Sequence, residues 1–307
     1  MTEKFLKLVF DGNETYDGAG VRLRRMFGGN STALLTDPFL LLDQFGSSVK
    51  EEYEKGFPWH PHRGIETVTY LLQGKVVHED SNGNRGTIYP SDVQWMSAAS
   101  GIYHQEMPSG MDPGNVEEAP RIRGSPITVS GFQLWINMPS RSKMDTPTYR
   151  DLRGSKVPIY KCNDGSTVKV IMGKYGDAEN RTRISGLVDP SYFDVSMVPD
   201  STISIRTGEG YTTILHGISG SGNLEGTESS LYPGSSFLMS NEGEGLSVQS
   251  SHDGFRFIIM SGRPLKEPVW WSGPIVMDSR EKLNQAFLDL KNGNFIRNRN
   301  PVFEELS

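Results

Sequence analysis

Short stretches of β-branched and aromatic residues, each ended by a glycine or proline turn, limit the fold more than any other feature of this sequence. Residues 66–72 and 93–96 are two such stretches, and Gly74 ends the first of them. The chain carries 34 glycines and 18 prolines, enough for many turns. Short strands at a spacing of roughly eight to twelve residues are typical of sandwiches and barrels. The sequence therefore predicts an all-β fold.

The second half of the chain repeats this pattern weakly. Residues 212–220 resemble residues 67–74, and residues 231–239 resemble residues 88–96. The alternative is a coincidence between two β-rich regions with similar turns. We favour two related antiparallel β-barrels in tandem, because 307 residues suffice for two domains. The polar stretch near residue 140 places the domains at 1–140 and 141–307.

One helix is expected after the last strands. Asp278 and Glu281 have the spacing of a capping box, and Lys291 to Gly293 supply a stop signal. Between them an apolar stripe follows the helical period, formed by Leu283, Ala286, Phe287 and Leu290. We expect this C-terminal helix to pack on a barrel wall.

Charge and composition exclude several classes of protein. The net charge of −6 argues against binding to nucleic acid or to an anionic membrane. The single cysteine excludes an internal disulfide framework. The first residues lack the apolar core of a signal peptide, and no run approaches the ~18 apolar residues of a membrane helix. These features predict a soluble, cytoplasmic protein, or a nuclear one in a eukaryote. Residues 108–126 are predicted to form a long surface loop.

Four residues have the spacing of a metal site. His60 and His62 are two residues apart, as are His104 and Glu106, so each pair lies on one face of an extended strand. Neighbouring strands could bring both pairs to one point, giving three nitrogens and one oxygen. This set suits a divalent transition metal such as Fe(II), Mn, Co, Ni, Cu or Zn. It also leaves coordination positions open for substrate or O₂.

The other histidines and a nearby carboxylate leave alternatives open. Glu66 could be a reserve ligand or an imidazole partner, although four residues of strand after His62 span ~13 Å. His78 has no matching pair and is interpreted as a structural histidine near a turn. His216 and His252 are isolated, so the second barrel is expected to hold no metal.

Aromatic residues surround the predicted metal site in the sequence. Phe57, Trp59, Trp95 and Tyr103 could form the wall of a pocket for a flat organic ligand, with Trp59 at its rim. The alternative is that they are core residues, as aromatic side chains in β-barrels commonly are.

Several segments together closely resemble the pirin family of the cupin superfamily. The most specific is residues 56–70, which include both histidines of the first pair. The resemblance continues through residues 78–81, 90–98, 101–108, 134–139, 143–144, 273–277 and 285–287. Two positions depart from the family pattern: Ser91 stands where glycine is common, and Ser100 where a basic residue is frequent near the pocket mouth.

The resemblance implies a bicupin with metal only in its N-terminal barrel. It implies ligation by His60, His62, His104 and Glu106, with iron as the usual metal. Several family members resemble quercetin 2,3-dioxygenases, which open a flavonol ring with O₂ and release carbon monoxide. The implied ligands are thus a small aromatic substrate and O₂. We expect Glu106 to be the catalytic residue, accepting a substrate proton when it detaches partly from the metal.

Two other functions remain open at this point. Animal pirins are described as nuclear, iron-dependent transcriptional co-regulators, so this chain could be a redox-responsive module that binds a protein partner without turnover. A cupin with a purely structural metal is the third possibility. A monomer is expected, because the two barrels of a bicupin already pack on each other.

Overall fold

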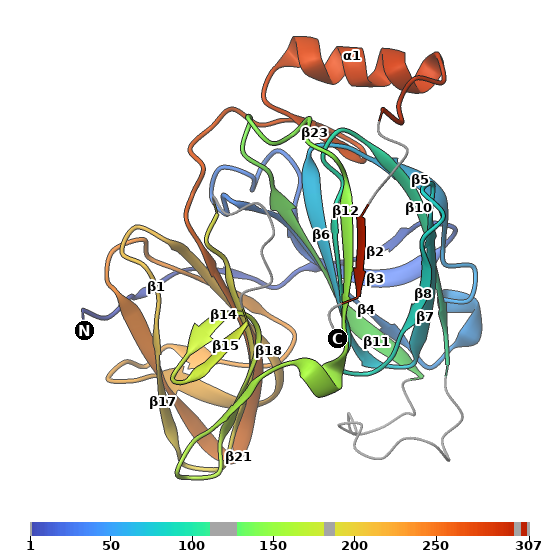
Figure 1. The fold of residues 1–307 in the computed structure, drawn as a ribbon. Helices are drawn as coiled ribbons and strands as arrows, with labels where there is room; N and C mark the ends of the chain where they lie inside the picture. Colours follow the sequence, from blue (N-terminus) through green and yellow to red (C-terminus); the bar gives the residue numbers. More distant parts are fainter. Residues whose placement is uncertain (1, 111–127, 181–187, 298–301, 306–307) are drawn as a thin grey trace. The chain divides into compact units, whose positions relative to one another are not determined.

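Strands dominate the computed structural model, which describes residues 2–110, 128–180, 188–297 and 302–305 (Figure 1). Most of the loop predicted at 108–126 lies outside these residues. The only α-helix in the described ranges is α1 (Arg280–Lys291). The predicted all-β fold with a C-terminal helix is confirmed.

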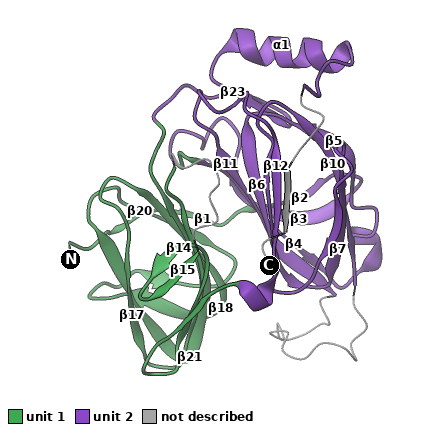
Figure 2. Cartoon of the chain, in the orientation of Figure 1, with its two compact units in different colours: residues 1–12, 36–38, 157–265 green, residues 13–35, 39–156, 266–307 purple. Residues whose placement is uncertain are grey.

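The chain folds into two compact units, shown in purple and green in Figure 2. We call the first the histidine unit; it comprises residues 13–35, 39–156 and 266–307. The second unit comprises residues 1–12, 36–38 and 157–265. The sequence predicted a single boundary at residue 140, and this division has several. The strand at residues 6–10 belongs to the second unit, where it pairs with residues 236–239, and the segment after residue 265 belongs to the histidine unit.

The second unit is built on one ten-stranded sheet. Its strands are β1 (Leu6–Phe10), β13 (Ile159–Lys161), β14 (Thr167–Tyr175), β15 (Ala178–Asn180), β16 (Ser191–Met197), β17 (Thr202–Arg206), β18 (Thr212–Leu224), β19 (Ser230–Leu231), β20 (Ser236–Met239) and β21 (Gly245–Gly262). β1 joins it by antiparallel pairing with β20. Valine, isoleucine, leucine and phenylalanine side chains fill its core, including Phe237 and Phe257.

The histidine unit contains two larger sheets that stay separate instead of closing into one barrel. An eight-stranded sheet contains β2 (Asn13–Asp17), β3 (Val21–Gly28), β4 (Phe39–Ser47), β11 (Val129–Asn137), β6 (Ile65–Gln73), β9 (Val93–Ser97), β12 (Thr148–Leu152) and β24 (Val302–Glu305), in that order. The four-stranded sheet has the order β5 (Phe57–His62), β10 (Ile102–Ser109), β7 (Lys75–Asp80) and β8 (Arg85–Ile88). Shorter elements are β22 (Trp270–Ser272), β23 (Ile275–Met277) and the 3₁₀ turns Lys50–Glu52 and Gly154–Lys156.

Helix α1 begins one residue later than predicted. The hydroxyl of Ser279, not the carboxylate of Asp278, caps the helix by accepting a hydrogen bond from the backbone N–H of Lys282. Its buried face also differs from the predicted stripe: Phe287 is 39% exposed, whereas Asp289 is buried. In the part of the chain that the structure describes, no helix is long and apolar enough to cross a membrane.

Candidate metal centre

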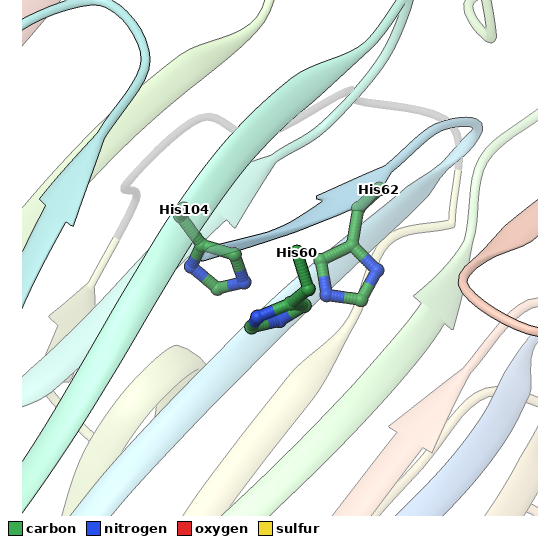
Figure 3. Close-up of side chains that lie close together, drawn as sticks. All are labelled: His60, His62 and His104. Carbon is green, nitrogen blue, oxygen red and sulfur yellow. The ribbon is translucent and has the colours of Figure 1, made fainter. Parts of the chain in front are cut away.

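Three histidines from two neighbouring strands converge in the histidine unit. His60 and His62 lie on β5, and His104 lies on β10 directly opposite His60. Because alternate residues of a strand share a face, His60 and His62 point the same way. One ring nitrogen of each histidine lies within 4.8 Å of those of the other two. Figure 3 shows the three imidazole rings turned toward one another.

The hydrogen bonds of these rings leave nitrogens available for an ion. Nδ1 of His60 lies 2.8 Å from the carbonyl oxygen of Pro58, and Nδ1 of His62 lies 3.2 Å from that of Pro274. A proton on each Nδ1 leaves Nε2 unprotonated, which is the tautomer that ligates a metal through Nε2. Nε2 of His104 is buried without a hydrogen-bond partner. A buried nitrogen without a hydrogen-bond partner fits the role of a metal ligand.

The surroundings keep two of the imidazoles neutral at pH 7. Burial, reinforced by the neighbouring His60, lowers the pKa of His62 to about 3. Burial and the same neighbour hold the pKa of His104 well below its ordinary value. A neutral imidazole can donate its lone pair to an ion without first losing a proton. The donor set and its protonation therefore fit a divalent transition metal.

Glu106 reaches the same region but is not part of the three-histidine group. It lies on β10, two residues after His104, and its Oε1 accepts a hydrogen bond of 3.1 Å from the hydroxyl of Thr69. Burial raises the pKa of its carboxyl, while His60 and the Thr69 hydroxyl oppose that rise. The structure thus places Glu106 beside the histidines, where it could be a ligand or a proton acceptor.

Glu66 is held on a different side of the eight-stranded sheet. It precedes Thr69 by three residues on β6, so the two side chains point to opposite faces. Its carboxylate accepts a hydrogen bond of 3.2 Å from the indole of Trp95. This alternation explains why Glu66 lies outside the histidine group although it follows His62 by only four residues.

A cavity of about 750 Å³ opens beside the histidines. Residues of both larger sheets line it, so it lies between them. Its wall includes His60, His62 and Glu106, together with apolar side chains from Leu23, Leu41, Phe45, Phe57, Val76, Pro108, Trp135 and Trp271. A cavity of this size, with a largely apolar wall and polar side chains beside it, is typical of a small-molecule site.

The predicted aromatic wall is only partly correct. Phe57 lines the cavity, but Trp59 is 48% exposed and is not among the lining residues. Trp59 adjoins His60 on an extended strand, so its side chain points the other way. Trp95 is bonded to Glu66, and Tyr103 packs against Phe295. The sequence did not reveal that Trp135 and Trp271 line the cavity. The centroids of their rings lie 5.9 Å apart, and the ring of Trp135 also packs against His62.

A row of four polar side chains crosses the eight-stranded sheet where it faces the cavity. Thr69 on β6 pairs with Gln133 on β11, which pairs with Asp43 on β4, which pairs with Arg25 on β3. All four residues line the cavity. Arg25 donates hydrogen bonds of 2.8 Å to both carboxylate oxygens of Asp43. The two charges at this end of the row therefore balance each other. The other end reaches Glu106 through Thr69.

The C-terminal part of the histidine unit supports the strand that carries the histidines. The backbone N–H of Val276 bonds to the carbonyl of Arg63, the residue after His62. The buried Arg63 guanidinium lies 2.7 Å from Asp289 of α1 and donates to the carbonyl of Phe295.

The ammonium group of Lys143 ties the same region together. It lies within hydrogen-bond distance of the carbonyls of Gly64 and Val276 and of the Asn137 side chain. Burial lowers the pKa of Lys143 to about 7. The turn after His62 is therefore held both by the C-terminal segment and by a buried lysine.

The remaining histidines lie outside the three-histidine group. His78 is buried against Tyr149 and Asp151; its ring lies 2.8 Å from the Tyr149 hydroxyl and 3.2 Å from the Asp151 carboxylate. This network agrees with the structural role that the sequence suggested. In the second unit, His216 contacts Ser236 and the exposed His252 contacts Asp200.

The structure shows the environment of the two residues that depart from the family pattern, Ser91 and Ser100. Ser91 adopts a positive φ of 75°, so it takes the left-handed conformation that glycine would adopt at lower cost. Ser100 is buried and is not among the residues that line the cavity. That this serine removes a charge near the pocket mouth stays a prediction.

Comparison with known proteins gives matches across both units. The family model described as Pirin matches residues 20–136, and the model described as Pirin C-terminal cupin domain matches residues 192–296. A Thermoplasma acidophilum protein, provisionally named as a quercetin 2,3-dioxygenase, is 39% identical over 85% of this chain and 100% of its own length. Human Pirin is 37% identical over 95% of this chain and 93% of its own length.

Solved structures agree with these sequence matches. A crystal structure of quercetin 2,3-dioxygenase from Acinetobacter baumannii has a TM-score of 0.82 and 30% identity, and the match covers 95% of this chain and 98% of that one. Together with the C-terminal cupin domain model, it confirms the predicted fold of two cupin domains with a C-terminal helix.

Proposed function

This chain belongs to the pirin family, and on that premise we propose that it is a metal-dependent dioxygenase that opens the ring of a quercetin-type flavonol with O₂. The observation that carries the proposal is the group of three histidines, two of which, His60 and His62, line an aromatic-walled cavity. The names of the relatives from T. acidophilum and A. baumannii support the same activity.

The proposed metal ligands are His60, His62, His104 and Glu106, with iron(II) as the first candidate and Mn, Co, Ni, Cu or Zn as alternatives. A divalent ion in this position supplies Lewis-acid polarisation of a substrate oxygen. His60 and His62 are held for this role by hydrogen bonds from Nδ1 to backbone carbonyls. The buried Nε2 of His104 supplies the third nitrogen.

The residues around the ion have separate proposed tasks. Trp135, Trp271 and Phe57 provide flat apolar surface for an aromatic substrate and limit the access of water to the site. Glu106 is the proposed acceptor for the proton of the flavonol 3-hydroxyl, because burial already favours its protonated form. Loss of that proton makes the substrate electron-rich enough to react with O₂.

Oxygen uptake after anaerobic loading tests this function. The protein is loaded with Fe(II), mixed with quercetin without O₂, and then exposed to O₂ while uptake and carbon monoxide are measured. We expect one carbon monoxide released per O₂ consumed, together with the ring-opened ester. No turnover of any flavonol with Fe, Mn, Co, Ni or Cu would overturn the proposal.

The same assay separates the dioxygenase from the regulatory alternative. An iron-dependent co-regulator or protein-binding module would bind metal and release no carbon monoxide. Its protein partner, the monomeric state and a cytoplasmic or nuclear location all stay predictions from the sequence.

A further inference from the structure

Thr69 connects the two sheets at the metal-site end of the cavity. It lies on β6 in the eight-stranded sheet, whereas Glu106 lies on β10 in the four-stranded sheet. The Thr69 hydroxyl is 3.1 Å from Oε1 of Glu106 and 2.5 Å from Oε1 of Gln133. All three residues line the cavity. This hydroxyl is thus the bridge between Glu106 and the polar row that crosses the eight-stranded sheet.

The bridge fixes one oxygen of the Glu106 carboxylate. Thr69 and Glu106 are both buried, so the hydrogen bond is protected from competition with water. Because Oε1 accepts this bond, Oε2 is the oxygen left for an ion or a substrate proton. A carboxylate on a rotatable side chain needs such an anchor to present one chosen oxygen.

Gln133 determines where the single hydroxyl proton of Thr69 can go. A hydroxyl donates to one oxygen at a time, so Thr69 cannot donate to Gln133 and to Glu106 together. When the Gln133 amide presents its nitrogen, Gln133 donates to Thr69 and the proton of Thr69 is directed to Glu106. The structure turns Oε1 of Gln133 toward Thr69, and direct strand pairing holds Gln133 there, so a turn of the amide group alone produces this arrangement.

We infer that Thr69, backed by Gln133, is a positioning residue that holds Oε1 of Glu106 and presents Oε2 to the metal or the substrate. The inference rests on the proposed function of this site and adds a residue that acts through Glu106. It predicts that the hydroxyl of Thr69, not its volume, matters for the site.

The test compares Thr69→Val, which keeps the shape and removes the hydroxyl, with Thr69→Ser, which keeps the hydroxyl. Each is loaded with Co(II), and the visible absorption of the ion reports the geometry of its ligands. A second arm measures kcat and KM for quercetin with Fe(II). Thr69→Ala serves as a second hydroxyl-free variant if the valine variant does not fold.

We expect Thr69→Val to change the Co(II) spectrum and to lower kcat by about 10- to 100-fold, with a much smaller change in KM. Thr69→Ser is expected to rescue the parent spectrum and most of kcat. Equal spectra and equal kcat in the parent and the valine variant would overturn the inference, as would serine behaving like valine.

The two arms keep this inference distinguishable from the proposed function. If the parent binds Co(II) but turns over no flavonol, the dioxygenase proposal fails, while a spectral change in the valine variant still supports the role of Thr69. If the parent turns over quercetin and the valine variant is unaffected, only the inference fails. A parent that binds neither Co(II) nor Fe(II) overturns both.

Discussion

Replacing His104 by alanine is expected to weaken the binding of a divalent metal by at least about 100-fold. Loss even of residues that only orient metal ligands commonly costs 10- to 100-fold, and His104 is a proposed ligand itself. Its Nε2 is buried and has no hydrogen-bond partner, so in the metal-free protein alanine removes packing but no hydrogen bond of that nitrogen. The effect should therefore appear in the metal-bound state.

Thermal unfolding with and without Co(II) measures this difference. An ion at 100 times its Kd stabilises the folded parent by about 2.7 kcal/mol, and this gain should fall to about 0.4 kcal/mol or less in His104→Ala. His252→Ala is the matched control, because His252 is exposed in the second unit and pairs there with Asp200. Equal stabilisation of the parent and His104→Ala by Co(II) would contradict the assignment.

Replacing Arg63 by methionine is expected to lower the free energy of unfolding by about 3 kcal/mol or more. Arg63 and Asp289 form a buried ion pair, and removal of one partner leaves the other charge buried with fewer contacts. Arg297 and Gln285 still contact Asp289, which limits the loss. Because Arg63 directly follows His62, we also expect weaker metal binding.

Urea unfolding of three proteins tests this prediction: the parent, Arg63→Met and the control Lys282→Met. Lys282 lies in the first turn of α1 and its exposed ammonium group pairs with Asp278, so its removal should cost less than about 1 kcal/mol. Similar losses in both variants would show that the buried pair has no special role.

The same pair predicts a dependence of stability on pH. Burial alone would raise the pKa of Asp289, but hydrogen bonds from Arg63, Gln285 and Arg297 lower it to about 2. A carboxyl with a lowered folded-state pKa contributes stability that is complete above about pH 4 and is lost as the pH falls toward 2. Arg63→Met should show less of this loss than the parent.

The strands and the histidine pairs could be predicted because both follow from local spacing. Residues two apart share a face of any extended strand, so His60 with His62 and His104 with Glu106 were recognisable without a fold. The same alternation, counted on β6, places Glu66 and Thr69 on opposite faces. Local spacing in the sequence is therefore enough to identify the proposed metal ligands.

The rest of the site depends on chain segments that are distant in the sequence. The carbonyl of Pro274 contacts His62 from 212 residues away. Trp271 lines the cavity although it lies outside the segments with strong metal-site patterns. Backbone carbonyls have no sequence signal, and an aromatic residue in a β-rich chain looks the same in a core and in a cavity wall.

Helix α1 shows how a tertiary contact overrides a regular pattern. The apolar stripe favoured burial of Phe287, but that side chain is partly exposed. Asp289 is buried instead, because the guanidinium of Arg63 meets it. From the sequence alone, a charged residue on a helix is expected at the surface. The burial of Asp289 could be predicted only with knowledge of its partner Arg63.

The metal content of the purified protein tests the central claim most directly. The parent and the double variant His60→Ala/His62→Ala are loaded anaerobically with Fe(II), freed of unbound metal and analysed for iron. A centre built on the three histidines predicts one iron per chain in the parent and none in the double variant. A parent without iron, or a double variant that keeps one iron per chain, would contradict it.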